Sequence, residues 1–286
     1  MASMRDIKRR KGSIQSTQQI TKAMKLVSTV KLQRTKQRAL NSKAYFSYMY
    51  NTVQSILSKA GTINHSYVTG NDSTNKAVIV ISGNRGLAGG YNSNIVKLIT
   101  KGDLADDELI MYTIGKKCRE AFNRYGYVLA DDYSYMIEAP DYVDAMRLSA
   151  VLLNQYRKGE IGEIYLAFTA FKNTVSHEPT LLKLLPVDQS DVSIETDDKA
   201  DVPMNFEPAE EEALELIIPK YVASIIHGAM IESVASENGA RMQAMDSATS
   251  NAEEMIDKLT LQYNRARQGS ITQELTEIIA GAQAIS

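Results

Sequence analysis

Residues 245–266 read MDSATSNAEEMIDKLTLQYNRA, and this stretch decides the fold. Apolar or small residues recur in it at steps that alternate between three and four. That alternation is a heptad pattern, which is typical of a helix that packs along its length against another helix. Small residues on the seam let the two helix axes approach closely. The predicted seam consists of Met245, Ala248, Ala252, Met255, Leu259, Gln262 and Ala266.

The helix that carries this seam is predicted to cover 208–286, and its partner is a second long helix over 1–58. Residues 3–58 contain no proline and only one glycine, Gly12, which favours an unbroken helix. We expect an antiparallel coiled coil between the two ends of the chain. An ordinary helical bundle is the alternative, but it needs more helices than the sequence offers. Apolar residues of the first helix recur at Ile7, Ile14, Ile20, Met24, Val27 and Val30.

Proline 219 lies inside the second predicted helix. A proline removes one backbone hydrogen bond of a helix, and its ring crowds the preceding turn. We therefore expect Pro219 to kink this helix or to split off a short first piece.

The middle segment, 76–190, alternates strand and helix patterns. Ala77–Ser82 reads AVIVIS, a β-branched run that is typical of a strand buried on both faces. The alternation predicts a central, Rossmann-like α/β domain with three layers and a mainly parallel sheet. Other strands are expected at Leu109–Ile114, Tyr127–Ala130, Glu163–Ala170 and, at the sheet edge, Thr180–Leu185. Helices are expected from Ser93, over Lys116–Tyr125 and over Tyr142–Arg157.

The composition argues against metal, disulfide and cofactor chemistry. The single cysteine, Cys118, excludes an internal disulfide and a thiolate metal site. The three histidines have no ligand-like spacing. No apolar run reaches the roughly 18 residues that cross a bilayer, and the charged N-terminus lacks the apolar core of a secretory signal. We expect neither a metal nor a cofactor.

Charge is unevenly distributed although the formal net charge is only −2. Between Ile7 and Tyr67 there are many Lys and Arg residues and no Asp or Glu, whereas acidic residues dominate from Asp188 to Glu215. Such polarity indicates contacts with charged partners. A coiled-coil scaffold or a nucleic-acid-binding protein that uses the basic helix is one candidate function. However, the basic helix lacks interleaved aromatic residues, so we do not expect nucleic acid as a partner.

A glycine-rich loop, Gly83–Gly90, follows the first predicted strand and reads GNRGLAGG. It resembles a phosphate-binding loop, but it lacks the lysine and Ser/Thr that end a P-loop. Its glycine spacing does not match the dinucleotide fingerprint either. We therefore expect the glycines to permit a tight turn and close packing rather than to bind a nucleotide.

The C-terminal end of the chain is unusual because it carries no charged side chain from Ile278 to Ser286. Chain ends are normally polar and frayed, whereas an apolar end usually marks a surface that meets a partner. We hypothesise that an uncharged helix end, including Ile278, Ile279, Ala282 and Ile285, could turn inside a collar without strong directional pairs to lock it.

Three segments together resemble the gamma subunit family of bacterial F-type ATP synthases. They are Ile20–Met24 (ITKAM), Arg85–Gly89 (RGLAG) and the stretch from Ser236 to Ala284. The resemblance spans essentially the whole chain. It implies a central rotor stalk without a catalytic site, whose partners are the alpha and beta subunits of the catalytic ring, the epsilon subunit and the c-ring. It further implies a peripheral position on the cytoplasmic face of the bacterial plasma membrane, with membrane association only through the complex.

The resemblance also implies roles for individual residues. Arg267, Gln268 and Thr272 match residues that meet a loop of one beta subunit. Met24 and Lys25 match the part of the first helix beside an acidic lever of the beta subunit. Arg85, Gly86 and Leu87 match the glycine loop of the α/β foot. One departure is Asn84, which stands where many relatives have Asp.

Overall fold

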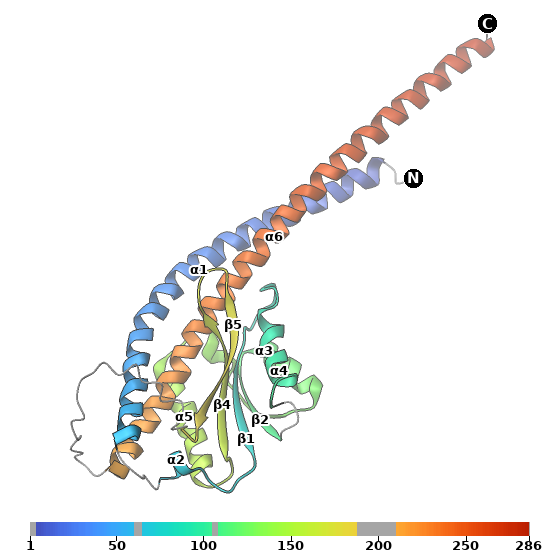
Figure 1. Cartoon of the computed structure of the whole chain (residues 1–286). Helices are drawn as coiled ribbons and strands as arrows, with labels where there is room; N and C mark the ends of the chain where they lie inside the picture. The colour runs from blue at the N-terminus through green and yellow to red at the C-terminus, as the bar shows by residue number, and fades with distance from the viewer. Residues whose placement is uncertain (1–3, 60–64, 105–107, 188–209, 286) are drawn as a thin grey trace. The chain divides into compact units, whose positions relative to one another are not determined.

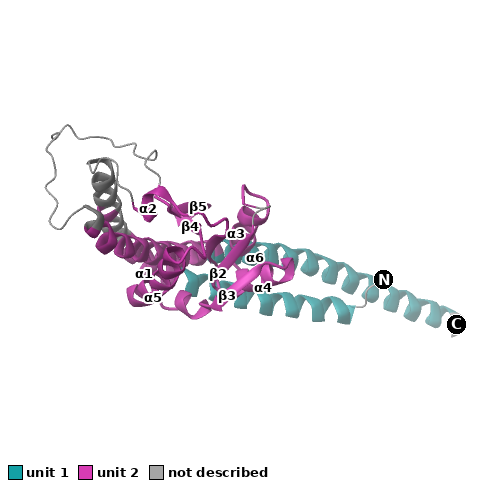
Figure 2. Ribbon diagram, turned by 90° about the horizontal axis from the view of Figure 1, so that it is seen from below, with its two compact units in different colours: residues 1–29, 241–286 teal, residues 30–240 magenta. Residues whose placement is uncertain are grey.

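The computed structural model of the chain describes residues 4–59, 65–104, 108–187 and 210–285. These residues divide into two compact units (Figure 2), one formed by 1–29 with 241–286 and the other by 30–240. Two long helices, α1 (Met4–Lys59) and α6 (Glu210–Ile285), contribute to both units. Most of the acidic stretch that begins at Asp188 lies outside the described residues.

The second unit is built on a five-stranded sheet with the strand order β3-β2-β1-β4-β5 (Figure 1). The parallel strands are β1 (Lys76–Ile81), β2 (Leu109–Ile114), β3 (Val128–Asp132) and β4 (Glu163–Phe171). Strand β5 (His177–Leu185) pairs with β4 in the antiparallel direction at one edge. The mainly parallel sheet with an added edge strand confirms the predicted fold class.

Helices cover both faces of this sheet, so the unit has three layers. Helices α3 (Tyr91–Thr100) and α4 (Lys116–Tyr125) pack on one face. Helix α5 (Tyr142–Arg157) and part of α6 pack on the other. Residues 77–81 of the central strand β1 are all at 0% exposure, with alternate side chains in the two cores. Burial on both faces explains why this strand reads as an unbroken apolar run.

Two short elements have no counterpart in the sequence-based prediction. They are the helix α2 (Ser66–Thr69) and the 3₁₀ helix η1 (Ser134–Ile137), each four residues long. A single turn contains too few residues for a periodic apolar pattern, so periodicity cannot reveal it.

Helix α6 continues through Pro219 as one helix, so of the two predicted outcomes the splitting off of a short piece was wrong, while a kink stays a prediction. The residues around the proline are firmly packed, since Leu214, Ile218 and Val222 are each at 0% exposure in the core. The Pro219 carbonyl oxygen also accepts a hydrogen bond from the Ser149 hydroxyl of α5 at 3.3 Å. Tertiary packing therefore outweighs the local preference against proline.

By length and composition alone, one helix among the described residues could cross a membrane, and it is α6. Its most apolar window is 61% buried inside the protein. Such burial is typical of a core helix, which passes the same test.

In the first unit, α1 and α6 pair in antiparallel directions. The Lys25 ammonium lies 2.6 Å from the Asp246 carboxylate, and the Thr21 and Thr249 hydroxyls share a hydrogen bond of 2.8 Å. Lys25 follows Thr21 along α1, whereas its partner Asp246 precedes Thr249 along α6, so the two helices run in opposite directions. Carried along both helices, this register brings Ile14 opposite Ile256 and Met4 opposite Ala266. The predicted antiparallel coiled coil is confirmed.

The composition of the seam differs from the prediction at several positions. Met255 is 51% exposed and Gln262 is also exposed, while Ile256 and Tyr263 are half-buried in their place. On α1, Ile20, Val27 and Val30 are 50% to 60% exposed. The buried positions beside them are the polar Thr21 (8%) and Ser28 (2%). The apolar pattern misled us because small polar residues occupy the contact where the two helices meet.

A disulfide between positions 21 and 249 should test this register. In the double variant Thr21→Cys/Thr249→Cys we expect an intrachain disulfide under mild oxidation, because the two hydroxyl oxygens are 2.8 Å apart. Non-reducing electrophoresis after proteolysis between the two sites would detect it. The control pair Thr21→Cys/Met255→Cys should remain reduced, and efficient bonding of that pair instead would contradict the register.

Candidate functional site

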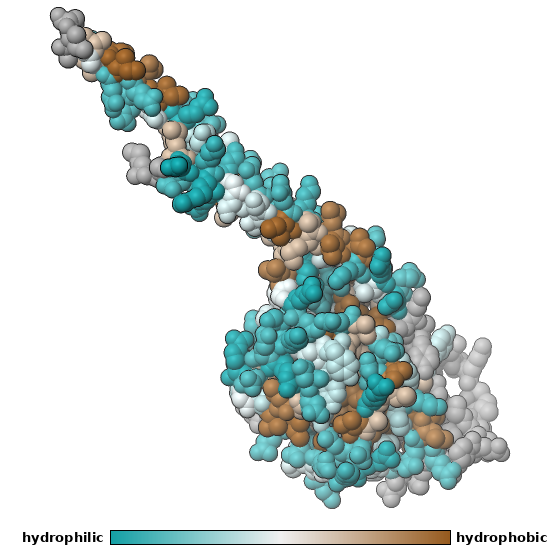
Figure 3. All heavy atoms as spheres, turned by 180° about the vertical axis from the view of Figure 1, so that it is seen from behind, coloured by the Kyte–Doolittle hydropathy of each residue, from teal (hydrophilic) through white to brown (hydrophobic). Residues whose placement is uncertain are grey.

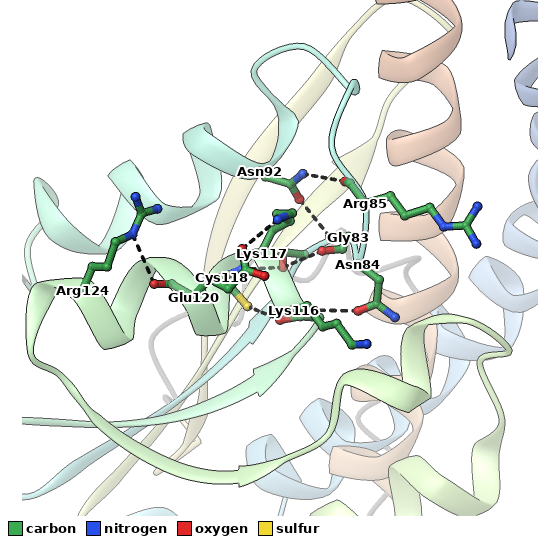
Figure 4. A network of polar contacts seen from close by, with 11 residues as sticks. Gly83, Asn84, Arg85, Asn92, Lys116, Lys117, Cys118, Glu120 and Arg124 are labelled. Atoms are coloured by element: carbon green, nitrogen blue, oxygen red, sulfur yellow. Dashed lines mark hydrogen bonds and ion pairs between the residues drawn. The ribbon is translucent and has the colours of Figure 1, made fainter.

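The glycine loop after β1 is held by two asparagine side chains (Figure 4). The Asn92 carbonyl accepts from the Gly83 amide at 2.9 Å, and its amide donates to the Arg85 carbonyl at 3.2 Å. The Asn84 amide donates to the Ser134 carbonyl at 3.0 Å and to the Glu138 carboxylate at 3.1 Å. An aspartate at position 84 could not donate these bonds and would face the Glu138 carboxylate, so asparagine suits this surrounding.

The first turn of α4 meets the same loop. The amides of Lys116, Lys117 and Cys118 donate to the Asn84 side chain, the Gly83 carbonyl and the Ser82 hydroxyl at 2.9, 3.2 and 3.0 Å. Free amides at a helix N-terminus are the groups that bind phosphate in nucleotide-binding folds. At α4 these three amides already have partners within the chain, which argues against a phosphate site.

The glycines of this region serve close packing. A Cβ atom on Gly83 would lie 2.6 Å from a carboxylate oxygen of Glu237 in α6. Gly115, between β2 and α4, has φ +123°, and a Cβ there would lie 2.2 Å from the Ser82 carbonyl oxygen. The loop can therefore approach its neighbours only because side chains are missing at these positions.

The segment Arg85-Gly86-Leu87 is exposed, as are Gly89 and Gly90 at the end of the loop. Leu87 is 64% exposed and has φ 61°, the one non-glycine residue with positive φ among those described. The Arg85 side chain extends away from the cluster of hydrogen bonds (Figure 4). A leucine held in the left-handed region and exposed to solvent is a departure that tends to occur at functional contacts.

The place where a doubly wound sheet usually binds its ligand is occupied by α6. In such sheets the ligand lies at the carboxyl ends of the strands, where the crossovers change face. Here that position lies between β1 and β4. Ser233 and Ser236 of α6 hydrogen-bond the main chain of Thr169 in β4, and Glu237 lies against Gly83 after β1. The chain's own helix thus fills the crevice.

Three other kinds of candidate site are the Cys118 thiol, groups of metal-binding side chains and a cavity in the α/β domain. Burial raises the pKa of the Cys118 thiol to about 12, far above the range of reactive cysteines. Among the described residues, no group of three or more His, Cys, Asp or Glu side chains could hold a metal ion.

A cavity of about 510 Å³ lies beside β2, β3 and α5. In it the Tyr112 hydroxyl donates to Gln155, and the Arg119 guanidinium donates to the Ala130 and Asp131 carbonyls.

The last part of α6 stands without a partner helix among the described residues. The register places Met4 of α1 opposite Ala266, and the described side chains from 271 to 283 are all exposed. Large apolar side chains gather there, as the brown spheres near the helix end show (Figure 3). They are Ile271, Leu275, Ile278 and Ile279, with exposures from 45% to 68%.

The predicted contact residues lie in two places. Arg267, Gln268 and Thr272 are exposed on the part of α6 that follows Ala266, and Ala282 lies nearer the end of the same helix. Met24 and Lys25 are half-buried on α1, where the Lys25 ammonium pairs with Asp246. The side chain of Ile285 lies outside the described residues.

Comparison with known proteins decides the family. A family model described as ATP synthase matches residues 3–285. The ATP synthase gamma chain of Lachnoclostridium phytofermentans is 60% identical over 291 residues, covering 100% of both chains. The chain belongs to the ATP synthase gamma chain family. The gamma chain of Acetobacterium woodii, named as sodium ion specific, is 38% identical and covers 99% of each chain.

Solved structures agree with the gamma fold. A chain of the Euglena gracilis mitochondrial ATP synthase has a TM-score of 0.66 at 18% identity, covering 99% of this chain and 94% of that one. A central-stalk chain of the Tetrahymena thermophila mitochondrial enzyme has a TM-score of 0.60 at 23% identity, covering 80% and 99%. At these identities the likeness supports the fold alone.

Proposed function

We propose that this chain is the central rotor stalk of a bacterial ATP synthase. In this function it couples rotation of a c-ring to the conformational cycle of the catalytic beta subunits. The observation that carries the proposal is the end of α6, which has no partner helix among the described residues and exposes large apolar side chains, with no charge from Ile278 on. In water such a surface is unfavourable, so a surrounding partner is expected. Family membership indicates which partner, namely the ring of alpha and beta subunits.

A stalk needs an asymmetric surface if it is to favour a different state in each beta subunit. The described helices provide one, because α6 extends past the first described residue of α1 and the two helices expose different side chains. On α1 the exposed face combines apolar residues such as Ile20 and Val27 with basic ones such as Lys22. A basic face suits an acidic segment of a beta subunit. Lys25, whose ammonium is already shared with Asp246, would contribute there mainly through its position.

We assign the remaining contacts in the same way. Arg267, Gln268 and Thr272 would bind a loop of one beta subunit, and Ile278, Ile279, Ala282 and Ile285 would form the apical bearing. In the α/β domain over 76–190, the exposed Arg85-Gly86-Leu87 loop would be a contact of the foot. The helices over 1–58 and 208–286 would form the shaft. The foot would bind the epsilon subunit and the c-ring, and the chain would lie at the cytoplasmic face of the membrane only through the complex.

The chain itself is proposed to be non-catalytic. Support comes from the occupied amides of α4 and from α6 in the crevice between β1 and β4. These features predict that the isolated chain binds neither ATP nor NAD with micromolar affinity. Isothermal titration calorimetry at a protein concentration of about 50 μM would detect binding with a Kd of about 1 μM, which corresponds to a binding free energy of roughly −8 kcal/mol. A saturable nucleotide isotherm that disappears in an Asn84→Ala variant would refute the proposal.

Reconstitution tests the stalk function directly. The chain should co-purify with cognate alpha and beta subunits as a complex that hydrolyses ATP, and it should retain no nucleic acid at moderate salt. A chain that stays monomeric beside a folded alpha–beta ring, yet binds DNA or RNA, would instead support the nucleic-acid-binding scaffold. Vesicles that contain the whole complex, assayed separately for H⁺ and Na⁺ uptake, would identify the coupling ion.

A further inference from the structure

One segment of α6 is buried around its whole circumference. Residues 235–239 are all buried, and five consecutive buried positions cover the full circumference of a helix with 3.6 residues per turn. Three of these residues are polar: Ser236 (0% exposed), Glu237 (9%) and Asn238 (5%). Buried polar side chains on a helix require specific partners. We call residues 232–239, together with the groups that surround them, the α6 socket.

The partners on one side are main-chain groups at the carboxyl end of β4. The Ser233 hydroxyl accepts from the Thr169 amide at 3.4 Å, and the Ser236 hydroxyl donates to the Thr169 carbonyl at 3.1 Å. The Glu232 carboxylate accepts from the Phe171 amide at 3.2 Å. Main-chain groups of a strand in a sheet are fixed in position, so these three bonds tie α6 to the sheet itself rather than to mobile side chains.

Two close approaches complete the socket. The carboxylate of Glu237 lies against Gly83, where an added Cβ would lie 2.6 Å from a carboxylate oxygen and would displace it. The ring of His177, the first residue of β5, lies against Gly239, where a Cβ would meet the ring at 2.6 Å. Burial of the ring lowers the pKa of His177, which disfavours its charged form. The nearby charges on the β4–β5 hairpin, Lys172 and Glu178, pair with each other.

We propose that the α6 socket is the joint by which the α/β domain holds α6 against turning about its own axis. This inference rests on the proposed rotor function, which requires torque to pass between the domain and the helix. Turning α6 by one residue position, roughly 100°, would remove all three β4 bonds and leave buried polar groups without partners. Apolar contacts earlier in α6, such as those of Ile225 and Ile226, resist separation of the helix from the sheet, but they are less directional than hydrogen bonds. The socket also contains the last residues of α6 before this unit ends at Ala240.

The first test uses the whole complex in vesicles with the double variant Ser233→Ala/Ser236→Ala. We expect ATP hydrolysis to stay within about twofold of wild type. Ion uptake per ATP hydrolysed should fall about thirtyfold, which is the factor that corresponds to the loss of two ordinary hydrogen bonds of about 1 kcal/mol each. Thr69→Ala is the matched control, because it removes a hydroxyl bond to a main-chain carbonyl outside the socket. Unchanged uptake per ATP in an assembled double variant would overturn the proposal.

A second pair of variants keeps the test decisive if the serine variant assembles poorly. Gly239→Ala should lower uptake per ATP because its methyl group displaces His177, and adding His177→Ala should restore it by vacating that space. Loss in the single variant without recovery in the double variant, or no loss in either, would contradict the socket. Failure of the rotor function itself would look different, since then even the wild-type complex would show hydrolysis without ion uptake.

Discussion

Replacing Gly115 by alanine is expected to destabilise the chain by about 4 kcal/mol, from left-handed backbone strain of roughly 1–2 kcal/mol and overpacking of roughly 1–3 kcal/mol. Gly115 has φ +123°, a conformation that side-chain-bearing residues rarely adopt. In addition, the new Cβ would lie 2.2 Å from the Ser82 carbonyl oxygen. That oxygen belongs to the main chain just after β1 and cannot rotate away. Relief therefore requires β1 and α4 to shift apart.

Urea denaturation of the full chain, followed by circular dichroism, would measure this loss. Gly126→Ala is the matched control, because Gly126 also has positive φ (+81°) but nothing lies within 4 Å of its Cβ position. It should show only the strain of about 1–2 kcal/mol. If Gly115→Ala were no more destabilising than Gly126→Ala, the close approach between β1 and α4 would be incorrect.

Replacing Arg267 and Gln268 together by alanine is expected to lower ATP hydrolysis by the reconstituted complex about a hundredfold, because charge-assisted hydrogen bonds contribute roughly 1.5–3 kcal/mol and neutral ones about 1 kcal/mol. Both side chains are exposed on the part of α6 that has no partner helix among the described residues. They are therefore free to make directional bonds to a beta subunit. Hydrolysis rates measured on complexes of equal size by gel filtration would give the ratio.

Deletion of Ile278–Ser286 is the comparison for this double variant. The helix end contributes many weak packing contacts rather than a few directional bonds. Its loss should leave hydrolysis within about tenfold of wild type, or roughly 1.4 kcal/mol in barrier. An intact complex that the deletion inactivates completely, while the double replacement has no effect, would refute the assignment of these two sites.

The sequence was sufficient for the α/β layers because burial leaves a direct trace there. Strand β2 and helices α4 and α5 have the predicted bounds, since each has an apolar face or run of adequate length. The coiled coil was harder to predict in detail. Its contact contains a threonine pair and a buried serine, Ser28, and these leave no hydrophobic signal.

The functional features that sequence reasoning missed depend on distant parts of the chain. The α6 socket joins Ser233 and Ser236 to Thr169, more than 60 residues away. Serine on a helix carries no sign of whether it faces water or a strand. A cluster of small and polar residues from Ser233 to Gly239, directly after the mostly apolar stretch 221–231 of the same helix, was the available signal. By contrast, the uncharged end of α6 was visible in the sequence because charge is easily counted.

The most direct test of the stalk function is to observe rotation of this chain. Tyr125 is 66% exposed at the end of α4, so Tyr125→Cys offers an attachment point for a bead, while the buried Cys118 with its raised pKa should stay unreactive. With the alpha–beta ring fixed to a surface, we predict that the bead turns in one direction when ATP is added and stops when ATP is removed. Steady ATP hydrolysis by such complexes with a bead that only fluctuates would contradict the account.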